Sequence, residues 1–504
     1  MDVTVATKLL AGGVGLFTVW ITCTCIYRLF FHPLAKFPGP KLNCVSSLPA
    51  IISLLRGRLP MDTKLLHDIY GPVVRVSPNE LSFDGPDAWD DIYGHRAGHL
   101  NMHKDPIHVG SVEAVPGVTT LTMSNDEVHA RQRRALSHPF SMKALLGQQD
   151  IVNSHVTKLM TAFKRLAKEE QIINVVDWYN FTTFDVIGDL CFAEPFGCLD
   201  EGEWHFWVKM IYETVKSGAI EQATRRIATV GSPLQKFLMN LIPGSVKKFR
   251  KDHLTYSNEK TLRRLADEKG EHRDFIYYIL RNNESKQLLT KDEILVNSAL
   301  FIVAGSETTA SFLAGWTNLL MRHRDVYDKL VAEVRSTFSS EDDIRFEVLK
   351  DLPYMSACIN EAMRVFPPVP AGLLRTVPRG GDTVSGYFVP EKTSVAVSSW
   401  AATHSARNFR EPDRFIPERW LDQAWDLDKK KASQPFSLGP RGCIGRNLSY
   451  MEQRLIMGRL LWNFDVFPAD EAKEWDTEGE MKYMRAFLTW EKPDLNIKLV
   501  PVVR

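Results

Sequence analysis

The chain has 504 residues, of which 62 are basic and 61 acidic, so its formal net charge is +1. That balance gives no support to nucleic-acid binding or to a generally cationic membrane-binding surface. The seven cysteines are odd in number and contain no Cys-x-x-Cys pair, which argues against a disulfide scaffold or a zinc ribbon and favours a reducing compartment.

The first predicted element is a membrane helix. Leu9 to Tyr27 reads LLAGGVGLFTVWITCTCIY, 19 residues without a charge, and a helix of this length nearly spans a hydrocarbon core of about 30 Å. A cleaved signal peptide is the alternative, but the apolar run is too long and lacks a small-x-small cleavage site. Lys8 precedes the run, whereas Arg28 and Lys36 follow it. The positive-inside rule therefore places the remainder of the chain in the cytosol, behind a single-pass anchor.

A proline-rich stretch, HPLAKFPGPKL, follows the apolar run. Its prolines prevent the helix from continuing and favour a stiff connector. Beyond it we find no repeat, no low-complexity tract and no second linker. The sequence therefore predicts an anchor at 1–31, a connector at 32–40 and one catalytic domain at 41–504.

Within that domain, helical patterns dominate from about 126 to 335 and again at 354–364. The segments 73–83 and 383–399 alternate and turn like short strands. The predicted fold class is mostly α with small β-sheets (α+β). Residues 401–438 form an irregular stretch that is long for a loop in a compact fold, and such loops usually carry function.

The most informative helix begins at Thr290, which forms a plausible capping box with Glu293. From Ile294 to Met321 its only ionisable residue is Glu307. A second membrane span is one reading of this pattern. We favour a helix through the protein interior, because the polar residues at its centre are costly against lipid.

The centre of this helix reads AGSETTA. Ala304 and Gly305 leave room for a flat ligand against the backbone. An isolated carboxylate, Glu307, beside the hydroxyl of Thr308 is a candidate for proton delivery, because burial favours the protonated carboxyl. The alternative is that these side chains only bond to nearby backbone carbonyls.

Two further motifs follow. Glu361 and Arg364 lie three residues apart in EAMR and share one helix face; Arg419, in PERW, could complete a buried triad, although most such pairs are surface bridges. The last motif is FSLGPRGCIG, Phe436 to Gly445, in which three glycines and a proline surround Cys443. Such a segment is a loop shaped around a neighbouring body.

These motifs resemble those of the cytochrome P450 family. Phe436, Gly439, Arg441, Cys443 and Gly445 match its F-x-x-G-x-R-x-C-x-G loop, residues 304–309 match its A-G-x-[DE]-T-[TS] helix, and residues 361–364 match its E-x-x-R. The order and separations match as well. The resemblance implies the family's triangular, mostly helical prism. The sequence departs from the family at Trp420, usually phenylalanine, and at His129, often tryptophan.

The resemblance also implies the site. Cys443 would be the proximal thiolate ligand of the iron of haem b, with glycine-bordered amides directed at the sulfur; the alternative is an inert buried thiol. Ala304, Gly305, Phe436, Gly439 and Gly445 would border the haem. The haem propionates would be bound by four basic side chains, His129, Arg133, Arg375 and Arg441.

The implied activity is monooxygenation with O2, in which Glu307 and Thr308 relay protons. Electrons would come from NADPH-cytochrome P450 reductase on the endoplasmic reticulum membrane, docking near Arg131, Arg134, Lys143 and Arg446, which could equally be ordinary solvated charges. Mostly apolar pocket segments, at 100–120, 206–215, 369–374 and 486–488, indicate a hydrophobic small-molecule substrate.

The connector and the segment HARQRRALSHPFS resemble microsomal fungal enzymes that oxidise terpenoid, polyketide or alkaloid intermediates of secondary metabolism. Hydroxylation or epoxidation is therefore expected. Desaturation, ring formation or rearrangement on the same fold, and a non-catalytic membrane haem-binding protein, are the alternatives.

Overall fold

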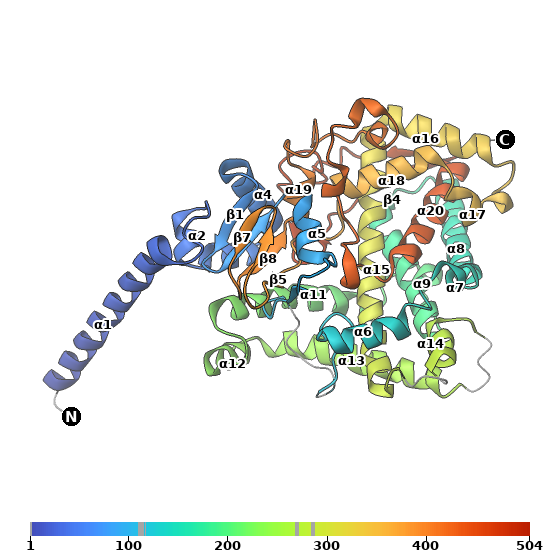
Figure 1. Ribbon diagram of the computed structural model, residues 1–504. Coiled ribbons are helices and arrows are strands. Elements are labelled where there is room, and N and C mark those ends of the chain that lie inside the picture. The colour runs from blue at the N-terminus through green and yellow to red at the C-terminus, as the bar shows by residue number, and fades with distance from the viewer. Residues whose placement is uncertain (1–2, 109–114, 116, 268–271, 284–287, 504) are drawn as a thin grey trace.

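Helix α15 (Lys291–Arg322) runs through the centre of the globular body in the computed structural model, and other helices surround it (Figure 1). The structure describes residues 3–503 except 109–114, 116, 268–271 and 284–287. Thr290 and Glu293 form the expected capping box at the start of α15. Because 72% of its most apolar window is buried inside the protein, the interior position is confirmed and the second membrane span is wrong.

The main hydrophobic core lies where α15 packs against α9 (Val175–Phe192), α18 (Pro353–Val365) and α20 (Arg446–Asn463). The remaining α-helices are α1 (Val3–Ile26), α2 (Lys41–Val45), α3 (Leu48–Leu55), α4 (Leu59–Tyr70), α5 (Asp87–Tyr93), α6 (Asp126–Leu136), α7 (Met142–Leu146), α8 (Gln149–Lys168), α10 (Cys198–Glu201), α11 (Phe206–Ile227), α12 (Pro233–Asn240), α13 (Gly244–Leu265), α14 (Phe275–Asn283), α16 (Arg324–Thr337), α17 (Phe346–Leu349) and α19 (Ser399–Thr403).

A five-stranded mixed sheet lies beside the helical body, on the side from which α1 projects (Figure 1). Its order is β1-β2-β8-β5-β3, and only the β2–β8 pair in it is parallel. The other strands form a three-stranded sheet, β4-β12-β9, and two hairpins, β6–β7 and β10–β11. Strand bounds are β1 (Val73–Ser77), β2 (Glu80–Phe83), β3 (His103–Lys104), β4 (Ile173–Asn174), β5 (Arg375–Thr376), β6 (Asp382–Val384), β7 (Tyr387–Val389), β8 (Ser394–Val397), β9 (Phe464–Pro468), β10 (Arg485–Ala486), β11 (Trp490–Glu491) and β12 (Asn496–Pro501).

The N-terminal helix α1 projects away from the body (Figure 1). Residues 11–31 are long and apolar enough to cross a membrane, and none of the most apolar window is buried in the protein. The chain leaves α1 through a short π-helical turn (Tyr27–Phe31) that has no buried residue but is hydrogen-bonded to the globule. There Nη1 of Arg28 donates to the carbonyl of Val45, and Nη1 of the buried Arg75 donates to the carbonyl of Arg28 at 2.8 Å.

Candidate haem site

The glycine-bordered loop ends directly at the first turn of α20 and holds Cys443 in a fixed position. The amide of Cys443 donates to the carbonyl of Phe436 at 2.8 Å, which closes the loop. Gly439 has a φ of +67°, and a Cβ there would lie 2.0 Å from the carbonyl oxygen of Tyr93. Both the backbone conformation and the close approach to α5 therefore require glycine at this position.

The sulfur of Cys443 is set deep in the protein, yet its side chain is accessible. Burial raises the pKa of this thiol, while hydrogen bonds from the amides of Gly445 and Arg446 and the positive charge of Arg133 oppose that rise. A Cβ on Gly445 would lie 4.0 Å from the sulfur. Amides and cations directed at a sulfur stabilise a thiolate, which is the form that ligates metals.

Beside this loop lies a cavity of about 320 Å³ between α5, α6 and the five-stranded sheet. The four basic residues expected at the haem propionates all line it: His129, Arg133, Arg375 and Arg441. Among the residues that the structure describes, two of them carry buried donors without a partner, Nε and Nη1 of Arg375 and Nη1 of Arg441. Because a buried donor without an acceptor is costly, these groups are suited to an anionic ligand in the cavity.

The charge states of this basic set differ. Burial, reinforced by the neighbouring Arg441 and Arg133, lowers the pKa of His129 to about 4, so its imidazole is neutral at pH 7 and acts as a neutral donor. Burial lowers the pKa of Arg375 to about 10, which leaves it charged. Arg133 reaches across to the cysteine loop, where its Nη1 donates to the carbonyl of Gly442 at 2.7 Å.

Lys104 is a fifth basic residue that the sequence did not single out. It lies on β3 directly opposite Arg375 on β5. Burial, together with the charges of Arg375 and Arg441, lowers the pKa of Lys104 to about 7. A single lysine in an irregular segment carries no motif, and only the pairing of two short strands far apart in the chain brings it to this cluster.

The residues present fit a haem. A porphyrin with two propionates needs several clustered donors, and Arg375 and Arg441 hold donors that bond to no described residue. It also needs an axial ligand, which the accessible sulfur of Cys443 can supply. The conclusion that these residues can hold a haem therefore depends on both the arginine donors and the accessible sulfur of Cys443.

Near the centre of α15, Ala304 is exposed and Thr308 half-buried, one turn apart on the same side of the helix. The hydroxyl of Thr308 donates to the carbonyl of Ala304 at 2.9 Å, as in the backbone-bonded alternative. A Cβ on Gly305 would lie 2.7 Å from Cδ1 of Ile187 on α9, so its missing side chain permits close helix packing. The place of Gly305 beside the haem stays a prediction.

Glu307 also differs from the expected isolated carboxylate. It forms a buried ion pair with Lys492, and Oγ of Ser311 donates to its Oε1 at 2.9 Å. The expectation of an isolated acid is therefore wrong. Lys492 lies 185 residues further along the chain, and no local pattern marks it.

The expected triad is present and fully buried. Arg364 binds both oxygens of Glu361, at 2.8 and 2.9 Å, and Nε of Arg419 donates to Oε1 of Glu361 at 3.0 Å. At position 420, where the family usually has phenylalanine, the tryptophan adds a hydrogen-bond donor. Its indole N–H donates to Oε2 of Glu361 at 3.0 Å. The remaining guanidinium donors bind backbone carbonyls and Asp428.

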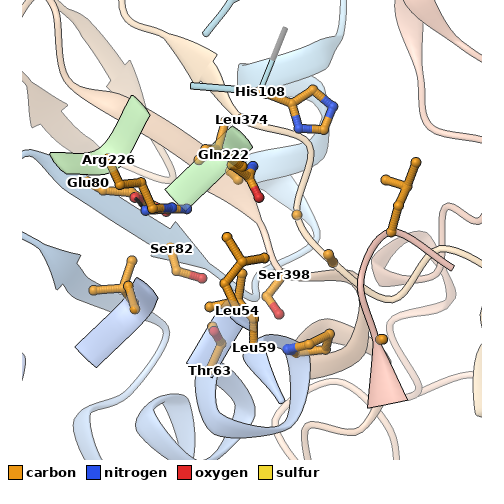
Figure 2. A pocket seen from close by; sticks show the side chains of 18 of the residues that line it. Leu54, Leu59, Thr63, Glu80, Ser82, His108, Gln222, Arg226, Leu374 and Ser398 are labelled. Carbon is orange, nitrogen blue, oxygen red and sulfur yellow. Dashed lines mark hydrogen bonds and ion pairs between the residues drawn. The ribbon is translucent and has the colours of Figure 1, made fainter. Parts of the chain in front are cut away.

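A second cavity lies between the sheet, α3, α4 and α11 (Figure 2). Two expected pocket segments line it, through Ala371, Gly372 and Leu374 and through residues 486–488. Polar side chains that the sequence did not single out line it as well: Thr63, Glu80, Ser82, Gln222, Arg226 and Ser398. His108 is the one described residue of 100–120 in this wall; residues 109–114 and 116 lie outside the described part of the chain.

Taken together, an accessible cysteine sulfur, a neighbouring cavity with a basic lining and an α-helix with an accessible Ala–Thr face define a haem-thiolate protein. The sequence model of the family described as cytochrome P450 matches residues 38–495. The chain therefore belongs to the cytochrome P450 family, whose members bind haem iron through an axial cysteine thiolate.

Relatives that are named cytochrome P450 monooxygenases align with this chain over nearly their full length. Cytochrome P450 monooxygenase aba2 of Botryotinia fuckeliana is 50% identical, with 97% of this chain and 94% of the relative covered. Cytochrome P450 monooxygenase ABA2 of Pyricularia oryzae is 46% identical, with coverage of 97% and 96%. Cytochrome P450 monooxygenase astA of Talaromyces wortmannii is 40% identical, with coverage of 98% and 97%. The chain is accordingly an oxidoreductase of the monooxygenase type.

Proposed function

We propose that Cys443 is the thiolate ligand of haem b and that the enzyme inserts one oxygen atom from O2 into a hydrophobic small molecule, by hydroxylation or epoxidation. The observation that carries this proposal is the accessible sulfur of Cys443 with the amides of Gly445 and Arg446 directed at it. The unpaired donors of Arg375 and Arg441 in the adjacent cavity support it.

The haem, when bound, supplies the activation of O2. The side chains of the protein would orient the haem and deliver protons to its cavity. His129, Arg133, Arg375 and Arg441, with Lys104 opposite Arg375, would bind the propionates of the haem and thereby orient it. Thr308 places a hydroxyl on the accessible side of α15, one turn from Ala304. Glu307, its neighbour in the chain, is the second residue of the proposed proton relay, and in this structure its carboxylate pairs with Lys492.

The substrate is a mostly apolar compound, because apolar residues make up most of the cavity wall and its two charged residues, Glu80 and Arg226, pair with each other (Figure 2). We place the reaction in fungal secondary metabolism, because the relatives from fungi span the chain end to end. Untargeted metabolite analysis after expressing the gene with a reductase in a fungal host tests this. A new product heavier by one oxygen atom is expected; a host metabolite profile identical to that of a Cys443→Ser strain contradicts the proposal.

A Thr308→Ala variant is expected to keep its haem but to waste electrons. Without the hydroxyl of Thr308, protons reach the haem cavity without control, so the fraction of consumed NADPH recovered as hydrogen peroxide rises several-fold. The measurement is NADPH, peroxide and product in one assay, with the substrate that metabolite analysis identifies. Thr309→Val is the matched control, because Thr309 is buried and bonded to Ser449 of α20. Full coupling in Thr308→Ala contradicts the relay.

We propose that α1 anchors the enzyme in the endoplasmic reticulum membrane with its catalytic domain in the cytosol, where NADPH-cytochrome P450 reductase supplies electrons. Among the four charges expected at the docking face, Arg131 is already engaged. Its two Nη atoms bind the carboxylate of Glu293 at 2.6 and 2.9 Å. Arg134, Lys143 and Arg446 remain the proposed docking charges.

Removing residues 1–25 is expected to move the protein into the soluble fraction with its haem content unchanged, because this segment is not buried in the protein. Removing residues 1–31 is expected to lower the yield of haem-bound protein as well, since Arg28 bonds to Val45 and Arg75 within the globule. Fractionation and the absorption spectrum of the reduced carbon monoxide complex measure both effects. A shorter deletion that stays entirely in the membrane contradicts the role of α1 as the sole anchor.

A further inference from the structure

Some polar side chains in the wall of the cavity of Figure 2 are already bonded within the protein, and others are not. Oγ of Ser82 lies 2.8 Å from Nε2 of His67, and Oγ of Ser398 accepts a hydrogen bond from the amide of Ala401 at 3.4 Å. These hydroxyls therefore hold the wall together. The donors that stay available to a ligand belong to a second group of side chains: His108, Gln222 and Arg226.

Arg226, near the end of α11, keeps an unused donor. Its Nη1 and Nη2 bind the two carboxylate oxygens of Glu80, the second at 3.1 Å, and its side chain is only 3% exposed. Nε of Arg226 is buried, and among the residues that the structure describes it has no acceptor. A guanidinium carries N–H donors on more than one edge, and a buried donor without an acceptor is costly. Arg226 can therefore bind an acceptor in the cavity in addition to Glu80.

Gln222 and His108 lie on the same side of the cavity as Arg226 (Figure 2). Gln222 precedes Arg226 by one turn of α11, so both share one helix face. Within the described part of the chain, neither the amide of Gln222 nor the imidazole of His108 has a hydrogen-bond partner. Burial and the positive charges of Lys104, Arg375 and the neighbouring arginines of α11 lower the pKa of His108 to about 3, so its imidazole is neutral with one N–H donor. All three side chains can donate a hydrogen bond, and their surroundings are positively charged.

We propose that this end of the cavity, formed by His108, Gln222 and Arg226, binds a carboxylate, so that the substrate is an apolar carboxylic acid. This substrate class rests on the proposed monooxygenase function. A carboxylate accepts several hydrogen bonds and donates none, which matches three donors better than a hydroxyl, whose own proton would need an acceptor. The negative charge strengthens each bond and suits the positive surroundings. The leucines and alanines elsewhere in the wall then contact the apolar remainder of the substrate.

The full-length enzyme, expressed with reductase in a fungal host, gives the first test. Trimethylsilyldiazomethane converts a carboxyl group into its methyl ester, so the oxygenated product and its precursor are both expected to gain the mass of one CH2 group on treatment. An oxygenated product that resists this esterification overturns the carboxylic acid and leaves the proposed function intact. A host that forms no oxygenated product contradicts the proposed function instead, and binding alone then decides on the acid.

The binding test uses two pairs of probes, dodecanoic acid with dodecanamide and cyclohexylacetic acid with its amide. Each amide keeps the shape of its acid but is neutral and adds N–H donors. Titration calorimetry measures their affinities at neutral pH for the full-length holoenzyme in phosphatidylcholine nanodiscs, with empty nanodiscs as the blank. At least one acid is expected to bind about tenfold more tightly than its amide, because a guanidinium binds a carboxylate more strongly than a neutral carbonyl. Equal affinities within both pairs overturn the proposed site.

Two variants isolate the guanidinium of Arg226, and haem content and the reduced carbon monoxide spectrum are measured for each. Glu80→Gln/Arg226→Gln removes both charges of the pair, so no buried ion is left without its partner, and it is expected to bind each acid and its amide equally. Glu80→Gln alone keeps Arg226 and removes a carboxylate that repels the ligand, so it is expected to prefer the acid at least as strongly as the wild type. The matched control, Lys236→Gln at an exposed lysine on α12, is expected to behave like the wild type. An acid preference that survives in the double variant, disappears in Glu80→Gln or falls equally in Lys236→Gln overturns the site.

Discussion

A Cys443→Ser variant is expected to fold and to lose the optical signature of thiolate-ligated haem. The serine keeps the loop, because the amide of residue 443 still donates to the carbonyl of Phe436 and Gly439 still fits against Tyr93. It removes the sulfur at which the amides of Gly445 and Arg446 are directed. The absorption band of the reduced carbon monoxide complex is therefore expected to shift to that of a haem without thiolate, with monooxygenase activity at background.

The basic residues of the cavity allow the loss of the axial sulfur to be distinguished from the loss of haem. Arg375 and Arg441 still offer unpaired donors to the propionates, so part of the haem is expected to be retained in Cys443→Ser and to be measurable by extraction. Cys358→Ser is the control, because Cys358 is fully buried in α18 and burial raises the pKa of its thiol well above the ordinary value. An unchanged carbon monoxide band in Cys443→Ser would refute the proposed ligand.

The parts of the fold that the sequence predicted depend on contacts and patterns among residues close together in the chain. The capping box at Thr290 is a contact between neighbours in the chain, and the alternating segments at 73–83 and 383–399 became β1, β2 and β6 to β8. The interior position of α15 followed from the polar residues at its centre, because solvation rules of this kind need no tertiary detail. Motif spacing then located the cysteine loop.

The parts that the sequence missed depend on partners far apart in the chain. Glu307 was expected alone because its counter-ion, Lys492, comes from a hairpin 185 residues away. Lys104 reaches the propionate cluster only through its register with Arg375. Gly305 packs against Ile187 of another helix, a contact that no local pattern marks. In each case the residue type indicated a special position, but the contacting residue was determined by tertiary packing.

The buried triad combines both kinds of information. The spacing of Glu361 and Arg364 put them on one helix face, whereas Arg419 arrives from a loop and was only a hypothesis until the structure placed its Nε 3.0 Å from Glu361. Oε1 of Glu361 also accepts from the amide of Ile416, at 3.0 Å. One carboxylate thus fixes the end of α18 to the long irregular segment that leads into the cysteine loop.

A Glu361→Gln variant is therefore expected to lose most of its haem-bound protein. The neutral amide leaves Arg364 without its bound carboxylate in a site of zero exposure. It also replaces one of the two oxygens with an NH2 group, so either Arg419 at Oε1 or Trp420 at Oε2 loses its acceptor. Removing one partner of a buried ion pair costs about 3–5 kcal/mol, a large share of the roughly 5–15 kcal/mol by which a folded domain is stable. The measurements are haem content after purification and the half-life of the reduced carbon monoxide band on mild heating.

The matched control for this effect is Glu411→Gln, whose pair with Arg414 is solvent-exposed on both sides. Exposed pairs contribute little to stability, so this variant is expected to match the wild type in both measurements. Because the cysteine loop follows the segment that Glu361 holds, the deficit in Glu361→Gln is expected in haem retention before it is seen in helix content by circular dichroism. Equal half-lives for Glu361→Gln and Glu411→Gln would show that the triad does not stabilise the haem-binding part of the fold.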